Sequence, residues 1–453
     1  MSAPLSPQAI VDAALSAAQG CEFAVVVRHS RSLNLRWANN QLTSNGDDTG
    51  TQVDIVAMDP DAGTATASGH VADTRDIVAL VSASRAAAAR AERTGEAEPL
   101  WDGGVSGDWD QDPRDTSAAV LDDVAAGLGR VFRSPGGASH SGYAESALTT
   151  TYLGTTAGSR LRHAQRTDRF EITARDSGRS AWAGHASLGV DVDEVAAGLA
   201  HDLGHQTRAL TVAPGRHRVI LSPSATADLM IDLYWNADAR PAAEGRSVFS
   251  DPDGGTRIGE RLAPAGLSLV SDPGDPELAT GDFEIVTADS DSASVYDHGL
   301  PLAATRWIDD GVLARLIAPR TVAGRLGVPA APGIDNLRLS VASGSGTVAD
   351  VVARTEDALL VTCLWYNRVV DPQTLLLTGL TRDGVYVVRD GQIVGSCGNF
   401  RFNESPVSLL SRIVDAGGGE RTLAREMGDY FNRAAMPALT VEDFNLSTAS
   451  EAH

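Results

Sequence analysis

The sequence contains few cysteines and few aromatic residues. Only Cys21, Cys363 and Cys397 occur in 453 residues, and they stand far apart without CxxC spacing. This pattern predicts neither a disulfide framework nor a cysteine-rich zinc site. Aromatic residues make up 5% of the chain, so we expect a core built mainly from alanine, valine and leucine.

Basic charge is also scarce. The chain has 37 Lys and Arg against 59 Asp and Glu, for a net charge of −22. Because phosphate contacts need clustered Lys and Arg, this balance argues against nucleic acid as the main partner. No run approaches about 18 apolar residues, so we expect no membrane span. The first residues, MSAPLSPQAI, lack a basic region followed by an apolar run, so we expect no signal peptide and a cytoplasmic protein.

Hydrophobic residues make up 43% and charged residues 21% of the chain, which is typical of a packed globular protein. The length suggests two or three domains. In the first half, Ser6 and Pro7 form a helix-start signal. We expect helices at 77–93, 117–132 and 192–210, and strands at 22–28, 32–39, 51–58, 147–153, 161–167 and 171–175.

The second half is predicted to be rich in strands. A break near Pro214 divides the chain into an N-terminal mixed α/β domain (1–213), with a sheet and flanking helices, and a β-rich domain (214–445). Beyond it we expect strands at 217–221 and 358–365 and a hairpin at 383–394 around Asp390 and Gly391. We also expect helices at 407–416 and 422–431 and a frayed tail over 446–453. The predicted fold class is therefore α+β.

His201 and His205 are the most suggestive metal ligands in the sequence. They stand four residues apart on a predicted helix with Asp202 beside them, as in HExxH zinc motifs. Asp is one methylene shorter than the usual glutamate base, and no third ligand is identifiable. The helix is expected to bury Leu199 and Leu203, which leaves both histidines near its exposed flank. A solvated helix is the favoured interpretation, and a divergent metal site stays open.

Other short motifs give weaker signals. The acidic turn at Asp289 fails the calcium-loop pattern, since Ser294 and Leu300 occupy the positions that need glycine and glutamate. No GxSxG or Walker A sequence occurs. Cys397, in GSCGNF, lies between glycines and is interpreted as a spectator thiol.

The segment 364–405 holds the richest group of polar and aromatic side chains. Arginine offers a rigid fork for carboxylates, and asparagine offers a donor and an acceptor to a peptide backbone. Such side chains beside strand edges suit a peptide bound as an added strand. Equally, the aromatics could pack in a core while the arginines pair with Asp371, Asp383 and Glu404, and both interpretations stay open. The candidate contact residues for a substrate or partner are Trp365, Tyr366, Arg368, Arg382, Arg401 and Asn403.

Several segments resemble, in order, the TldD/PmbA family of peptidases. The closest stretch is 365–409, with WYNR, TGLTRDG and NFRFNxS. The other matching segments are 33–43, 50–57, 218–224, 245–249, 259–262, 295–301 and 436–441. The resemblance implies a barrel-like C-terminal domain.

The resemblance also implies which zinc ligands this chain lacks. The family's peptidase subunits carry HExxxH on the helix before the segment that matches GRSVF, and a third ligand, a cysteine, before the final strand. Here that helix, 225–236, reads ATADLMIDLYWN without histidine, and 417–436 contains no cysteine. Cys397 lies too early to replace it. The chain therefore resembles the TldE/PmbA-like branch, which implies no catalytic or metal-binding residues of its own.

The resemblance implies a partner as well. TldE-like chains pair with a TldD-like, HExxxH-bearing homologue that holds zinc, and the heteromer acts on small, unfolded or modified peptides. This chain is expected to form part of the wall of the proteolytic chamber, to contact the substrate and to provide an interface for the partner. The alternatives are an autonomous hydrolase with a divergent site, and a peptide-binding or assembly protein without a protease partner.

Overall fold

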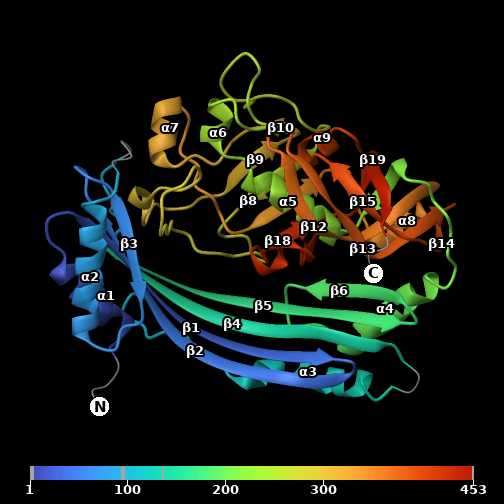
Figure 1. Cartoon of the computed structure of the whole chain (residues 1–453), viewed down its shortest axis with the longest axis horizontal. Coiled ribbons are helices and arrows are strands. Elements are labelled where there is room, and N and C mark those ends of the chain that lie inside the picture. Colours follow the sequence, from blue (N-terminus) through green and yellow to red (C-terminus); the bar gives the residue numbers. More distant parts are fainter. Residues whose placement is uncertain (1–4, 93–96, 135–136, 451–453) are drawn as a thin grey trace.

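The N-terminal half is one long antiparallel sheet with helices packed on it. A computed structural model of the chain describes residues 5–92, 97–134 and 137–450. The strand order is β3-β2-β1-β4-β5-β6, and Figure 1 shows the sheet extending beneath the C-terminal half. The strands are β1 (Glu22–Ala38), β2 (Gln41–Met58), β3 (Thr64–Gly69), β4 (Ser139–Thr155), β5 (Arg160–Asp176) and β6 (Arg179–His185).

The helices of this half cover the two ends of the sheet (Figure 1). Two pairs of helices pack against alternate residues of β1. Val25 and Val27 contact the pair at one end of the sheet, and Leu33 and Trp37 contact the pair at the other end. This alternation follows from the two-residue period of a strand. The first pair is α1 (Pro7–Ala17) with α2 (Thr74–Ala88), and the second is α3 (Asp122–Val131), preceded by η1 (Ala118–Leu121), with α4 (Val192–His205).

The predicted break inside β1 is wrong. Residues 22–28 and 32–38 belong to one strand, and Asn39 lies in the turn after it, because the polar residues between the two predicted strands find partners on both neighbouring strands. His29 Nδ1 lies 2.9 Å from Thr51 Oγ1, and Ser30 Oγ lies 2.8 Å from Thr149 Oγ1. The predicted strands at 161–167 and 171–175 are likewise one strand, β5.

The helix predictions of this half hold in position but not in length. The helix α1 begins after Ser6, whose side chain accepts the Ala9 N–H. The helix α2 begins earlier than expected, at a capping box formed by Asp73 and Asp76, and ends at Ala88. The expected end at residue 93 lies outside the described residues. The helix α4 ends at His205, five residues before the predicted end.

The C-terminal half contains a closed five-stranded barrel and a second sheet. The barrel strands follow the order β12-β7-β19-β15-β13, and β13 also pairs with β12. The second sheet has the order β10-β9-β8-β11-β18-β17. The barrel and its edge are β7 (Gly215–Leu221), β12 (Asp357–Asp371), β13 (Leu376–Arg389), β14 (Gln392–Cys397), β15 (Asn399–Glu404), β16 (Ile413–Ala416) and β19 (Leu439–Ser450). The second sheet comprises β8 (Leu267–Ser271), β9 (Thr305–Asp309), β10 (Val312–Leu313), β11 (Leu337–Val341), β17 (Glu420–Thr422) and β18 (Ala434–Met436).

One helix, α5 (Pro223–Trp235), is buried along nearly its whole length at the centre of this half. The remaining helices of this half are short. They are α6 (Ala239–Ala243), α7 (Arg320–Leu326), α8 (Val348–Ala353), α9 (Pro406–Leu410), η2 (Val295–Asp297) and η3 (Met427–Asp429). Figure 1 shows α6, α7, α8 and α9 around α5. The α+β class with a barrel-like C-terminal part is thus confirmed.

Three predictions near the C-terminus are wrong. The expected helix at 407–416 ends at Leu410, and β16 follows and pairs with β19. The expected helix at 422–431 is instead the end of β17, a loop and η3, because buried contacts fix that loop. Residues 446–450 of the expected frayed tail are strand, since β19 reaches Ser450 and pairs with β15 and β7, and residues 451–453 lie outside the described residues. No helix of the described residues is long and apolar enough to cross a membrane.

The hairpin predicted at 383–394 is present. The strands β13 and β14 turn at Asp390 and Gly391, both of which have positive φ angles of 50° and 75°. Such angles suit an Asp-Gly turn between two strands.

Candidate functional site

The six candidate residues lie on the outward face of the barrel strands β12, β13 and β15. Trp365 pairs with Leu380, which in turn pairs with Arg401 on the next strand. Arg368, Thr378 and Asn403 form a second row in the same way. We call Trp365, Tyr366, Arg368, Arg382, Arg401 and Asn403 the aromatic-basic face.

Trp365 is half-buried between two guanidinium groups. The Arg382 guanidinium carbon lies 5.5 Å from the centre of the Trp365 rings, and that of Arg425 lies 4.8 Å away. Arg425 also lies 4.9 Å from the ring centre of Trp182 on β6. A cation over an aromatic face is attracted by the electron density of the ring. Arg425 therefore joins the N-terminal sheet to the barrel through two tryptophans.

Tyr366 and Arg368 are held by Glu426. Tyr366 has a positive φ of 62° and is 59% exposed, and its backbone N–H donates to Glu426 Oε2 at 3.0 Å. Arg368 Nη1 donates to Glu426 Oε1 at 3.2 Å, and its guanidinium lies 4.8 Å from the Tyr366 ring centre. The glutamate thus fixes a strained backbone position and the cation beside it.

The arginines only partly follow the pairings considered from sequence. Arg382 Nε lies 3.6 Å from Asp383 Oδ2. Arg368 pairs with Glu426 rather than Asp371. Glu404 is taken by Arg412, which lies outside the aromatic-basic face.

Arg401 and Asn403 stand apart from the Glu426 contacts. Arg401 is exposed, and its Nη1 donates to Thr378 Oγ1 at 3.4 Å. Asn403 is half-buried on the same strand. The structure therefore gathers Trp365, Tyr366, Arg368 and Arg382 around one loop and leaves Arg401 and Asn403 at its side.

The loop that carries Arg425 and Glu426 is fixed from below by Asp228 on α5. The fully buried Asp228 carboxylate accepts the N–H of Arg425 at 3.2 Å and those of Glu426 and Met427 at 3.0 Å each. Burial raises the pKa of Asp228 well above its ordinary value, while these N–H donors act in the opposite direction. One turn later, Asn367 Nδ2 donates to Asp232 Oδ2 at 3.5 Å, and burial raises the pKa of Asp232 to about 7.

Sequence reasoning missed Asp228, Arg425, Glu426 and Trp182. The signal for Asp228 was present: a carboxylate inside the apolar helix ATADLMIDLYW must find partners, because an unpaired buried charge is costly. The other three are recruited by the fold from distant segments. They could not be identified from local spacing.

His201 and His205 contact each other on the surface of α4. Their Nε2 atoms lie 3.0 Å apart, and His201 is exposed. Burial raises the pKa of the neighbouring Asp202 to about 6. Within residues 5–92, 97–134 and 137–450, no group of three or more His, Cys, Asp and Glu side chains is placed to hold a metal ion.

Cys397 is buried at the end of β14. Its Sγ lies 3.7 Å from the Val385 carbonyl oxygen. Burial raises the pKa of this thiol to about 11, which disfavours the nucleophilic thiolate.

Zinc does not fit the side chains of α5. The helix offers only the oxygen ligands of Asp228 and Asp232, whereas protein zinc sites are built mainly from histidine nitrogen and cysteine sulfur. Both carboxylate oxygens of Asp228 are already engaged by the 425–427 main chain. No metal-dependent step is therefore assigned to α5.

Three solved structures share the whole fold. TldE from Thermococcus kodakarensis superposes with a TM-score of 0.74 at 13% identity, covering 97% of this chain and 99% of that one. A protein from Thermotoga maritima described as a candidate modulator of a DNA gyrase superposes with a TM-score of 0.75 at 16% sequence identity. The match covers 97% of this chain and 99% of that one. A protein from Bacteroides thetaiotaomicron with a similar description superposes with a TM-score of 0.77 at 14% sequence identity. The match covers 97% of this chain and 98% of that one.

Among curated proteins, no sequence matches the chain. The family defined by the PmbA/TldA metallopeptidase C-terminal domain matches residues 214–448. This region is more than half of the chain and contains the barrel, α5 and the aromatic-basic face. The chain therefore belongs to the TldD/PmbA family.

Proposed function

We propose that the chain is a non-catalytic, TldE/PmbA-like subunit of a heteromeric TldD/TldE-type zinc metallopeptidase. One observation carries the proposal. The helix α5 precedes the GRSVF segment, where the family's peptidase subunits hold HExxxH, and here it carries Asp228 and Asp232. Their carboxylates bind the 425–427 main chain and Asn367. The two carboxylates of this helix thus fix a loop and the strand that carries Asn367.

In this proposal, zinc and the general base belong to a TldD-like partner that carries HExxxH. A peptidase zinc ion polarises the scissile carbonyl and activates a water molecule, which requires an open coordination position. The chain itself supplies surface. The assembly is cytoplasmic and processes small, unfolded or modified peptides.

The aromatic-basic face is the part of the chain best suited to contact the peptide or the partner. Tyr366 is 59% exposed, and close to the same loop Tyr430 is 79% and Trp235 40% exposed. Exposed aromatic side chains are enriched at protein interfaces, since they bury much area with few rotatable bonds. Arg368 adds a cation beside Tyr366 that suits a carboxylate of the ligand.

The autonomous-hydrolase alternative has less support. A metal site at His201 and His205 needs a third ligand, and the described residues offer no such group. The other alternative is a peptide-binding protein without a protease partner. It differs from the proposal in predicting that no HExxxH-bearing homologue co-purifies with the chain.

Metal analysis and co-expression test the proposal. We expect the purified chain to hold substoichiometric zinc and to lack peptidase activity, and we expect activity after co-expression with an HExxxH-bearing homologue. The matched control is the same complex with the histidines of the partner's motif changed to alanine, which should be inactive. Stoichiometric zinc in the chain alone, with activity that a chelator abolishes, would contradict the proposal.

A further inference from the structure

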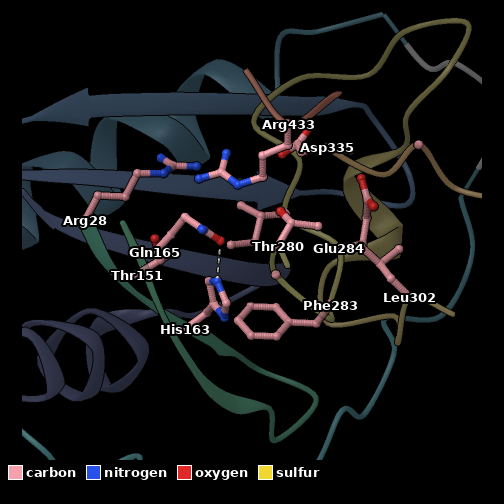
Figure 2. A pocket seen from close by; sticks show the side chains of 13 residues that line it. Arg28, Thr151, His163, Gln165, Thr280, Phe283, Glu284, Leu302, Asp335 and Arg433 are labelled. Carbon is pink, nitrogen blue, oxygen red and sulfur yellow. Dashed lines mark hydrogen bonds between the residues drawn. The ribbon is translucent and has the colours of Figure 1, made fainter. Parts of the chain in front are cut away.

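A polar hollow of about 290 Å³ lies between the N-terminal sheet and the loops of the C-terminal half (Figure 2). Strands β1, β4 and β5 contribute Arg28, Thr151, His163 and Gln165. A second hollow of about 400 Å³, next to Trp235 and Phe431, shares Glu284, Gly333 and Asp335 with the first. The two hollows therefore adjoin, and neither is lined by a residue of the aromatic-basic face.

One side of the first hollow is basic. Figure 2 shows the Arg28 and Arg433 guanidinium groups pointing toward each other. Arg28 is neutralised by the buried Asp54, at 2.5 Å. Arg433 donates to the Arg166 carbonyl at 3.0 Å and to Thr167 Oγ1 at 2.7 Å. These acceptors are neutral, and within the described ranges no carboxylate forms an ion pair with Arg433. The Arg433 charge is therefore available to an anion, to which Arg28 adds N–H donors but little net charge.

The other side is acidic. In Figure 2 the charged side chains follow the order Arg28, Arg433, Asp335, Glu284. Glu284 has no hydrogen bond or ion pair from its side chain to another described residue. Burial and the nearby Asp335 and Asp297 raise its pKa to about 8. Near neutral pH Glu284 therefore keeps its proton, and a cation placed beside it favours the charged carboxylate and release of that proton.

We propose that this hollow binds a short zwitterionic peptide, with its carboxylate between Arg28 and Arg433 and its ammonium group at Asp335 and Glu284. The order of two guanidinium groups followed by two carboxyl groups complements a ligand with one charge at each end, once the ammonium group has favoured release of the Glu284 proton. Thr151 and Thr280 also line the hollow, and their hydroxyl groups can donate to or accept from an amide. The Gln165 side chain, which lines it too, already bonds His163 and a main-chain carbonyl. The volume of this hollow, about 290 Å³, lies close to the lower end of the range of small-ligand pockets. The proposal stands whether or not the chain has a peptidase partner.

The direct test is calorimetric titration of the full chain near neutral pH with unblocked Ala-Ala. We expect saturable binding of one peptide per chain. N-acetyl-Ala-Ala, which lacks the ammonium group, and Ala-Ala amide, which lacks the carboxylate, should each bind at least tenfold more weakly. Absence of Ala-Ala binding, or equal binding of all three peptides, overturns the proposal. Alanine binding as tightly as Ala-Ala would overturn the choice of a peptide over an amino acid.

Two variants locate the site. Glu284→Gln keeps the shape of the side chain and should weaken Ala-Ala binding at least tenfold, and Arg433→Gln should do the same. The matched controls are Asp282→Asn and Arg75→Gln, which remove the same charges from exposed positions outside the hollow and should bind as the unmodified chain does. Should Arg433→Gln fail to fold, Glu284→Gln and the blocked peptides decide. Binding by Glu284→Gln equal to that by Asp282→Asn overturns the assignment.

Discussion

Asp228 and Met427 lie 199 positions apart in the sequence and are joined by a 3.0 Å hydrogen bond from the Met427 N–H to the Asp228 carboxylate. The same carboxylate accepts the N–H groups of Arg425 and Glu426. A side chain of the central helix thereby fixes the loop that carries Arg425 and Glu426. The side chains of this loop contact Trp365, Tyr366 and Arg368.

Asp228→Ala should destabilise the fold strongly. It leaves three main-chain N–H groups without their acceptor, and unsatisfied buried donors cost about 1–3 kcal/mol each. Allowing for partial rehydration of the loop, we expect a loss of about 2–4 kcal/mol in the free energy of unfolding, measured by urea denaturation. The control is Asp253→Ala, in an exposed turn, with a change within about 0.5 kcal/mol. Equal effects of the two substitutions would refute the role of Asp228.

Arg425→Lys tests the contact between the two halves of the chain. Lysine keeps the charge but loses the flat guanidinium that lies over Trp182 and Trp365 and pairs with Glu171. We expect a loss of about 1–2 kcal/mol in unfolding free energy and altered tryptophan fluorescence of the native state. Arg401→Lys, at an exposed arginine, is the control and should change neither. The interpretation fails if both variants behave alike.

Helix-start and turn signals in the sequence were reliable, whereas contacts between distant segments could not be predicted from it. Ser6 begins α1, and Asp390 with Gly391 forms the hairpin turn, because both signals act within a few residues. The continuity of β1 instead depends on Thr51 and Thr149, which lie on other strands. Sequence alone gives no register between strands that far apart.

The candidate site shows the same division. A period of two is readable from sequence, and it places Arg401 and Asn403 on the same face of β15. Trp365 and Arg368 are three positions apart and share a face only because β12 is irregular between them, which sequence does not reveal. The helix expected over 422–431 failed because Asp228 holds residues 425–427 in a loop, so tertiary contacts override the local helical pattern. The role of Arg425 between two tryptophans was hidden for the same reason.

Replacing both His201 and His205 with alanine should leave bound zinc and any peptidase activity of the assembled complex unchanged. The two imidazoles contact each other at the surface, and a two-ligand site is too weak to retain zinc. Mass spectrometry of metal content before and after substitution is the measurement. A loss of zinc or of activity would revive the divergent metal site.

Glu284→Gln should change the pH dependence of stability. In an unfolded chain glutamate titrates near 4.3, whereas in the fold the pKa of Glu284 is raised to about 8. Between these values the unfolded state binds fewer protons than the native state, so this group lowers stability as pH rises. Glutamine cannot ionise, so the Glu284→Gln variant should not lose this stability as the pH rises.

The corresponding measurement is urea unfolding of the Glu284→Gln variant and the unmodified chain at pH 5 and pH 8. The variant should gain stability relative to the unmodified chain between the two pH values, on the order of 1–3 kcal/mol, because the carboxyl faces an open hollow that reduces the full effect of the shift. Asp282→Asn should show no such gain. A difference between Glu284→Gln and the unmodified chain that does not vary with pH would show that Glu284 does not retain its proton.

Tyr366→Asn separates the exposed ring from the backbone that carries it. Asparagine tolerates a positive φ better than most residues, so the 62° angle and the N–H bond to Glu426 should persist while the ring is lost. In the complex with an HExxxH-bearing partner, we expect the Kd for the partner to rise at least tenfold, or the KM for peptide to rise at least tenfold. Val414→Ala, at a position 58% exposed on β16, is the control for loss of a surface apolar group. Unchanged Kd and KM for Tyr366→Asn would remove the ring from the proposed contacts and leave Arg368 and Glu426 with a purely structural role.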